Sequence, residues 1–86
     1  MKIFATARYI RLLDKFLKKH PDYNVLIGHR LDVLEKSPDH PALRLHKLSN
    51  RDNEYAIYVD QSIRIIFSRE KDTIYLLDIG SHDDVY

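Results

Sequence analysis

Residues 62–86, SIRIIFSREKDTIYLLDIGSHDDVY, decide how this chain folds. The first part alternates apolar and polar side chains apart from one extra apolar residue, Ile66, and this period of two is typical of a strand with one buried face. Residues 70–72 form a polar break of hairpin-loop length, and residues 73–79 are almost continuously apolar, as in a strand inside a sheet. We expect Gly80 to end this second strand and a polar tail to follow it.

Length and composition indicate one small globular domain, residues 1–86. The chain is 44% hydrophobic and 31% charged, which suits a single modest core. It contains no cysteine, which excludes disulfides, thiolate nucleophiles and cysteine-ligated zinc. No apolar run is long enough to cross a bilayer, and charges near the N-terminus come too early for a secretory signal. We therefore expect a soluble, cytoplasmic protein that has no membrane partner.

Charge is distributed unevenly along the chain, although the formal net charge is only +1. Residues 1–41 carry eight Lys or Arg and five Asp or Glu, hence +3, whereas residues 42–86 carry six and eight, hence −2. The N-terminal half is therefore the basic half. A protein that binds RNA gains affinity and association rate from positive charge, so this division bears on where RNA would bind.

The beginning of the chain predicts a short strand and then an amphipathic helix. Residues 2–6 are a mixed segment that we expect to be a strand. Residues 7–19 place one apolar stripe on a helix, formed by Tyr9, Ile10, Leu13, Phe16 and Leu17. Pro21 ends this helix, because the residue before a proline avoids the helical conformation.

A second amphipathic helix is expected from Asp22, its predicted N-cap, to about Lys36. Gly28 lies inside it and costs about 1 kcal/mol relative to alanine. Residues 37–41 contain two prolines and form a turn-rich linker. The two helices therefore predict a helical hairpin laid on a sheet.

Four segments typical of strands follow the helices. Residues 43–48 alternate loosely between leucines and polar side chains, and residues 55–59 form the next segment after a polar turn. A two-residue turn, Asp60 and Gln61, leads to the two strands described first. The order β-α-α-β-β-β-β predicts an α+β fold, in which the helical hairpin packs on one face of a curved, mainly antiparallel sheet.

Most catalytic signatures are missing from the sequence. There is no nucleophile elbow and, with only two glycines, no glycine-rich phosphate loop. The five histidines have no spacing typical of metal ligands. We therefore expect neither a metal nor another cofactor.

Metal-free cleavage of an RNA phosphodiester remains open to this sequence. It needs a base for the 2′-hydroxyl, an acid for the leaving 5′-oxygen and a cation beside the phosphate. Histidine suits the proton transfers because its unperturbed pKa is about 6.5, and the planar donor fork of arginine suits the phosphate. The C-terminal segments supply candidates for these roles and an aromatic ring that can stack on a base: His46, Arg64, His82 and Tyr86. His46 and Arg64 alternate with apolar neighbours, so we expect both on the sheet face opposite the helices.

Each of these side chains also has a purely structural explanation. His46 and His82 lie where exposed surface histidines are common, and Tyr86 is the last residue of the sequence. Arg64 has carboxylates within reach for a cross-strand ion pair: Asp60, Asp78 or Glu54. Three other tyrosines are expected to pack in the sheet: Tyr55, Tyr58 and Tyr75.

Three short motifs occur in order in the second half of the chain. They are DHPALRLHKL at residues 39–48, IRIIF at residues 63–67 and IGSHDDVY at residues 79–86. Together with the order of elements, they resemble the RelE/ParE superfamily of bacterial toxins, in particular its RelE/StbE or YafQ-like branch, over nearly the whole chain. Each motif is weak alone, but three in the right order are fairly specific.

The resemblance implies the toxin of a type II toxin–antitoxin pair. Such a toxin is a ribosome-dependent endoribonuclease, an mRNA interferase that inhibits translation, and a cognate antitoxin protein silences it. By position, three residues resemble the catalytic set of this branch: His82 as terminal acid or base, His46 as second histidine, and Arg64 as the arginine at the phosphate. Three others resemble substrate-binding positions: Tyr86, Lys47 and Arg44.

Departures from the family pattern leave two other functions open. Tyr58 or a neighbour stands where YafQ-like relatives often carry a histidine, and RelE itself is more basic than this chain. One alternative is a ParE-like toxin that inhibits DNA gyrase by binding it, although such a binder has no need of His46 and His82. The other is a catalytically weak family member that mainly binds its antitoxin, which the acidic second half favours.

Overall fold

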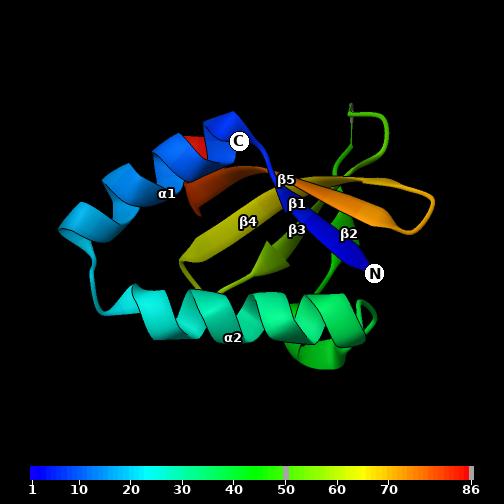
Figure 1. The fold of residues 1–86 in the computed structure, drawn as a ribbon, viewed down its shortest axis with the longest axis horizontal. Coiled ribbons are helices and arrows are strands. Elements are labelled where there is room, and N and C mark those ends of the chain that lie inside the picture. Colours follow the sequence, from blue (N-terminus) through cyan, green and yellow to red (C-terminus); the bar gives the residue numbers. More distant parts are fainter. Residues whose placement is uncertain (50, 86) are drawn as a thin grey trace.

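Two helices cover one face of a five-stranded sheet in the structure, a computed structural model that describes residues 1–49 and 51–85 (Figure 1). In chain order the elements are β1 (Lys2–Ala5), α1 (Ala7–Lys19), α2 (Tyr23–Lys36), the 3₁₀ turn η1 (Pro41–Leu43), β2 (His46–Lys47), β3 (Glu54–Tyr58), β4 (Ile63–Glu70), β5 (Thr73–Ser81) and α3 (His82–Val85). The predicted α+β class and order of elements are confirmed, and η1 and α3 are two short additions.

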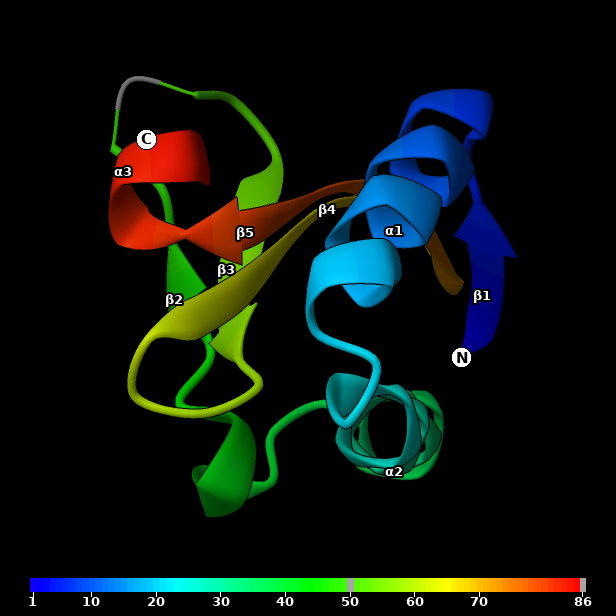
Figure 2. The ribbon, with the colours of Figure 1, turned by 90° about the vertical axis from the view of Figure 1, so that its left-hand side faces the viewer.

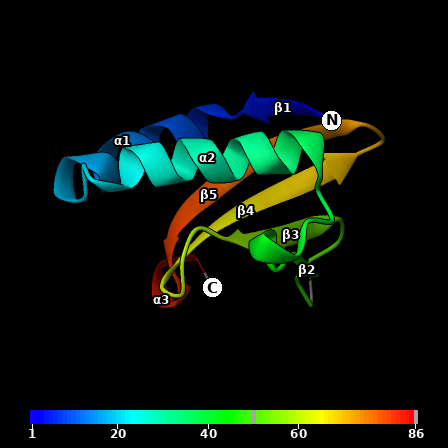
Figure 3. The same ribbon diagram turned by 90° about the horizontal axis from the view of Figure 1, so that it is seen from below.

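The sheet has the strand order β1-β5-β4-β3-β2. Strands β2 to β5 form the predicted antiparallel meander. β1 lies at one edge and runs parallel to β5, where it pairs only with residues 73–76. Within the described chain, the second half of β5 therefore has a strand partner on one side only, and it curls away from β1 (Figure 3).

α1 begins and ends where the sequence predicts. Thr6 is its N-cap: Oγ1 accepts a hydrogen bond from the amide of Tyr9 at 3.2 Å, and the hydroxyl donates to the carbonyl of Leu76 at 2.6 Å. These two bonds satisfy an orphan amide of the helix and tie its start to β5. At the other end, the amide of His20 donates to the carbonyl of Phe16 at 2.9 Å.

α2 follows its predicted N-cap residue, Asp22, and ends at Lys36 as predicted, but the Asp22 side chain does not cap the helix. Asp22 has helical dihedral angles (φ −67°, ψ −16°) and makes no side-chain capping hydrogen bond to a described residue. The helix begins instead with turn bonds, from the Tyr23 amide to the His20 carbonyl and from the Asn24 amide to the Pro21 carbonyl. None of the described helices combines the length and the apolar composition needed to cross a bilayer.

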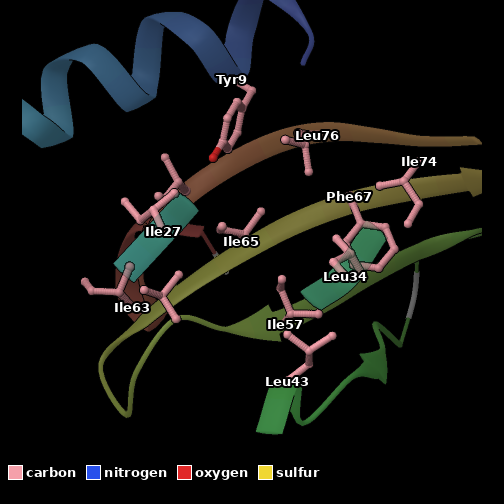
Figure 4. Packing of buried hydrophobic residues seen from close by; sticks show 12 residues of the cluster. Tyr9, Ile27, Leu34, Leu43, Ile57, Ile63, Ile65, Phe67, Ile74 and Leu76 are labelled. Carbon is pink, nitrogen blue, oxygen red and sulfur yellow. The ribbon is translucent and has the colours of Figure 1, made fainter. Parts of the chain in front are cut away.

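The main core lies between the helices and the sheet (Figure 4). Tyr9 of α1 points at the sheet from one side, and Ile27 and Leu34 of α2 approach it from the other. The strands contribute a row of fully or almost fully buried residues: Ile57, Ile63, Ile65, Phe67, Ile74, Leu76 and Ile79.

A second, smaller cluster lies on the opposite face of the sheet, made of Leu48, Ala56, Ile66 and Val85. Val85 belongs to α3, so α3 packs on the face that points away from α1 and α2 (Figure 2). This accounts for the extra apolar residue in the sequence, because β4 is buried on both faces at Ile66. A β-bulge next to Ile66 adds Leu77 to β5, and Leu77 packs against the same cluster.

The expectation that Gly80 ends its strand is wrong. β5 runs through Gly80 to Ser81, and Gly80 pairs with Arg64 of β4. The predicted polar tail is also different, because His82–Val85 form α3.

The predicted strand over residues 43–48 is largely replaced by a turn. Pro41–Leu43 forms η1, which buries Leu43 completely, and only His46–Lys47 pair with β3. Leu43 faces inward because a 3₁₀ turn puts it there, not because a strand alternates.

Candidate functional site

On the sheet face opposite the helices, the side chains of Arg44, His46 and Arg64 each contact Tyr58, and we call these four residues the Tyr58 cluster. Tyr58 and Arg64 face each other in the register of β3 and β4, and Arg64 Nη2 donates to the Tyr58 hydroxyl at 3.3 Å. Their sequence neighbours on both strands are buried under the helices, so the alternation of a strand puts Tyr58 and Arg64 on the other face. The predicted orientation of Arg64 is confirmed.

The loop between β3 and β4 sets this pairing. The Val59 amide donates to the Ile63 carbonyl at 2.8 Å, so the turn between these two residues has three residues, Asp60 to Ser62, instead of the predicted two. Asp60 Oδ1 accepts hydrogen bonds from the amides of Ser62 at 2.9 Å and Ile63 at 2.8 Å, which fixes the turn. A two-residue turn would have paired Tyr58 with Ile63, so the loop length decides that Tyr58 meets Arg64.

α2 holds this loop from the helix side of the molecule. The hydroxyl of Tyr23 donates to Asp60 Oδ2 at 2.6 Å, and Arg30 Nε donates to the Val59 carbonyl at 3.1 Å. Partial burial opposes ionisation of Asp60, but the hydrogen bonds from Tyr23 and two backbone amides outweigh it and lower the pKa of Asp60. The same hydrogen bond is the largest cause of a raised pKa of Tyr23. The loop is therefore anchored by a charged acceptor.

Arg44 and His46 reach Tyr58 from the segment before β3. Arg44 follows η1 and has left-handed dihedral angles (φ 51°, ψ 44°), which are uncommon for a residue other than glycine and occur often at functional sites. Its guanidinium carbon lies 4.7 Å from the centre of the Tyr58 ring, and that of Arg64 lies 4.6 Å away. The His46 ring centre is 5.9 Å from that of Tyr58, and His46 Nδ1 is 3.3 Å from the Arg44 carbonyl oxygen.

Two cations beside one phenol change the ionisation of that phenol. The hydrogen bond from Arg64 is the largest cause that lowers the pKa of Tyr58 below the ordinary value of a tyrosine, and the charges of Arg64 and Arg44 act in the same direction. Partial desolvation opposes them. The cluster is therefore a locally positive surface within the half of the chain whose formal charge is −2, and it favours anions.

His82 is exposed and is the first residue of α3. β5 brings it there: Gly80 pairs with Arg64 and Ser81 pairs with Ile63, so His82 follows two residues after the strand partner of Arg64. His46 lies on β2 opposite Ala56, which belongs to the same small cluster as Val85 of α3. The two histidines thus lie on elements that share the sheet face away from α1 and α2 (Figures 2 and 3).

Lys47, another predicted site residue, is not part of the Tyr58 cluster. Lys47 pairs with Tyr55, whose ring stacks on the buried Phe67 with centroids 5.7 Å apart. Because cross-strand partners share a face, Lys47 lies on the helix side of β2. Tyr86 lies outside the described residues.

The carboxylates expected as alternative partners of Arg64 bind elsewhere. Asp60 accepts from Tyr23 and from its own loop, and Asp78 forms an ion pair with Arg8 at 3.3 Å. Glu54 pairs with Arg51 at 3.5 Å.

Tyr58 is the site residue that sequence reasoning assigned to packing. It lies between Ile57 and Val59, which are both fully buried, and this alternation is a signal that its ring points to the free face. The sequence did not show that Arg44 and Arg64 converge on it, because that depends on a left-handed residue and on the loop length. Within the described part of the chain, no three metal-binding side chains lie close enough together to hold an ion.

Several toxins of known structure share this fold. Neither a family model nor a curated protein sequence matches the chain. The E. coli DinJ-YafQ toxin–antitoxin complex contains a chain that superposes with a TM-score of 0.83 at 16% identity, covering 99% of this chain and 96% of that one. A metal-bound toxin from Helicobacter pylori gives a TM-score of 0.83 at 17% identity, covering 100% and 99%. The YoeB dimer from Staphylococcus aureus gives 0.72 at 16% identity, covering 95% and 97%.

The architecture is therefore the RelE-like toxin fold, an open mixed sheet with two helices on one face. The YafQ structures share this fold, which is the fold that the resemblance in the sequence implied.

Proposed function

We propose that this chain is the toxin of a type II toxin–antitoxin pair and that it cuts mRNA on the ribosome in the cytoplasm, without a metal. The observation that carries the proposal is the Tyr58 cluster: two arginines and a histidine meet on one ring, on the sheet face that also holds α3 and His82. Support for the toxin role comes from the solved toxins with this fold.

The proposed reaction is an internal transfer at the phosphate. A base removes the proton of the 2′-hydroxyl, and the 2′-oxygen attacks the phosphorus. The bond to the 5′-oxygen breaks as an acid gives that oxygen a proton. The products are a 2′,3′-cyclic phosphate and a 5′-hydroxyl.

His82 and His46 are the proposed acid–base pair. Both are exposed, and imidazole is the side chain best suited to give or take a proton at neutral pH. Arg64 and Arg44 are the proposed cations for the negative charge that grows on the phosphate oxygens. Their guanidinium groups flank a site that a single phosphate can reach, because both contact the same ring.

Tyr58 is the proposed positioning residue of this site. Its ring and hydroxyl hold Arg64 by a hydrogen bond and a cation–π contact, and its ring holds Arg44 by a second one. Removal of the hydroxyl alone, as in Tyr58→Phe, should break the hydrogen bond to Arg64 while leaving both guanidinium groups on the ring. We expect a smaller loss of cleavage in Tyr58→Phe than in Tyr58→Leu, which also removes the two cation–π contacts.

Inducible expression in bacteria without the partner tests the activity. We expect growth arrest and shortened mRNA, and we expect His82→Ala to relieve both, because losing a general acid or base lowers a rate by about 10²–10⁴-fold. His29→Ala is the matched control, since His29 is exposed on α2, away from the Tyr58 cluster. Circular dichroism should show both variants folded.

Three outcomes would contradict the nuclease. A folded His82→Ala protein that stays fully toxic would remove His82 from the mechanism. Growth arrest with intact mRNA and altered DNA supercoiling would indicate a gyrase inhibitor instead. A wild-type chain that is expressed, folded and harmless would leave only a module that binds an antitoxin.

A further inference from the structure

β1 is an edge strand whose outer side is open. It pairs in parallel with β5 without a bulge, and within the described chain no strand lies on its other side (Figures 2 and 3). The amides of Lys2 and Thr6 donate to carbonyls on the β5 side, at 2.9 and 3.2 Å. Because backbone groups alternate along a strand, the amides and carbonyls of Ile3 and Ala5 point outward. These outward groups form no hydrogen bond with another described residue.

The side chains of β1 leave this edge unprotected. Exposed edges in natural sheets are usually short, charged, bulged or interrupted by proline. β2, the opposite edge, fits this rule, because it has only two residues, His46 and Lys47. β1 has four residues, with one charge at its start, Lys2, and an aromatic ring in its middle, Phe4. Phe4 is 61% exposed, although its ring packs against that of Tyr75 with centroids 6.0 Å apart.

We propose that β1 pairs with β1 of a second copy of this chain, antiparallel and with the two Phe4 residues opposite each other. In this register Ile3 of each copy pairs with Ala5 of the other, so their outward amides and carbonyls form four hydrogen bonds. The two Phe4 residues then form the non-hydrogen-bonded pair, with Cα atoms about 4.5 Å apart. An aromatic pair at such a position stabilises a sheet, and the two five-stranded sheets become one.

The same register suits the other side chains of β1. Lys2 lies opposite Thr6 of the second copy, so the two Lys2 residues are four residue steps, or about 14 Å, apart. This distance exceeds the Debye length of about 8 Å at physiological ionic strength, so their repulsion is screened. On the helix side, Ile3 lies opposite the small Ala5, and both pack against the main core. The formal net charge of +1 adds little repulsion between whole copies.

A second copy fits this edge better than RNA does. RNA needs several cations for its phosphates, but Lys2 is the only basic residue of β1. The free backbone groups match another strand instead. The sequence around Phe4 also matches itself when it is reversed, with apolar Ile3 and Ala5 on either side of the ring.

The proposed dimer leaves the Tyr58 cluster uncovered. Tyr58 and Arg64 lie on β3 and β4, and β5 separates these strands from β1. A twofold axis perpendicular to the joined sheet would put both copies of the cluster on the same face. The pairing goes beyond the proposed nuclease function and does not depend on it.

Cysteine cross-linking tests the register, because the chain has no cysteine of its own. Phe4→Cys places two thiols at a pair close enough for a disulfide, whereas Lys2→Cys places them about 14 Å apart, beyond the limit of about 7 Å between Cα atoms. Under mild oxidation we expect Phe4→Cys to form a covalent dimer at least about 10-fold faster than Lys2→Cys. Equal rates in the two variants would overturn the proposed register.

Analytical ultracentrifugation measures the association itself. For the wild-type chain we expect a dissociation constant of about 100 μM, because the interface is small. Phe4→Glu and Phe4→Lys each put like charges opposite each other and should weaken association at least about 10-fold, whereas a mixture of the two variants should restore it. Val25→Glu is the matched control, since Val25 is 81% exposed on α2, and it should change the constant by less than about 2-fold.

Three results would overturn the pairing. The first is a wild-type chain that stays monomeric up to about 1 mM. The second is a mixture of Phe4→Glu and Phe4→Lys that associates no better than either variant alone. The third is a short single-stranded RNA that shifts the NMR signals of the Phe4 ring in a chain that does not self-associate, which would assign this surface to RNA. No cleavage is measured, so the nuclease proposal and this one stand or fall separately.

Discussion

Ile65 and Ile66 are adjacent in β4 and point to opposite faces of the sheet, which makes them a matched pair for testing how α3 is held. Ile65 is 0% exposed and lies in the main core under the helices, while Ile66 is 1% exposed and packs with Val85 of α3. Replacing either isoleucine by alanine removes the same atoms from a buried site. We expect each variant to lose about 3 kcal/mol of the free energy of unfolding, within the 2–5 kcal/mol typical of such truncations.

Both variants should stay folded, because a domain of this length typically unfolds with a free energy of about 4–13 kcal/mol. Their effects on the site should differ. Ile66→Ala removes the surface on which Val85 rests, so α3 and His82 should shift relative to Arg64. Ile65→Ala opens a cavity on the helix side and leaves α3 seated.

Urea unfolding measures the stability of the two variants, and methyl NMR spectra measure the packing of Val85. In Ile66→Ala the Val85 methyl signals should move toward those of an unpacked valine, and RNA cleavage should fall at least about 10-fold, as for a misplaced catalytic group. In Ile65→Ala the Val85 methyl signals and the rate of RNA cleavage should both stay near those of the wild type. Unchanged Val85 signals in Ile66→Ala, or equal loss of cleavage in two folded variants, would refute the reasoning.

Three further substitutions test the energetics of the fold. Gly28→Ala should raise the free energy of unfolding by about 1 kcal/mol in urea titrations, because Gly28 is an exposed mid-helix residue and nothing lies within 4 Å of the added methyl group; a loss of stability would contradict this. Tyr9→Phe should add about 1 kcal/mol to the free energy of unfolding, because the buried Tyr9 hydroxyl has no hydrogen-bond partner among the described residues. Burial raises the pKa of Tyr9 to about 12, so above pH 10 the tyrosine ionises more readily in the unfolded chain and wild type loses stability. The gain should therefore grow above pH 10, and a flat alkaline profile would count against it. Tyr23→Phe should cost about 1 kcal/mol of the free energy of unfolding at pH 7, because it removes the hydrogen bond to Asp60. The lowered pKa of Asp60 stabilises the fold above about pH 4, and this contribution is lost as the pH falls through the pKa of the folded state. The difference from wild type should therefore shrink in acid, and a constant difference would show that the bond to Asp60 is not its source.

Local patterns in the sequence determined much of the fold. The apolar stripe of residues 7–19 and Pro21 fixed the bounds of α1, because helix periodicity and a proline stop act within a few residues. The alternation around Arg64 fixed the face of the sheet on which it lies, because a strand turns every second side chain to the same side. The motifs around His46, Arg64 and His82 also indicated the fold that the solved toxins share.

The contents of the site were decided only by the tertiary structure. Tyr58 meets Arg64 because Asp60 bonds to the amides of Ser62 and Ile63 in a three-residue turn, and a turn one residue shorter would have paired Tyr58 with Ile63. Arg44 reaches the same ring because it takes a left-handed conformation after a 3₁₀ turn. Such turns depend on single hydrogen bonds and on packing from distant elements, as with the bond from Tyr23 of α2 to Asp60. Periodicity therefore tells which face a side chain takes, while the three-dimensional fold decides which side chains meet there.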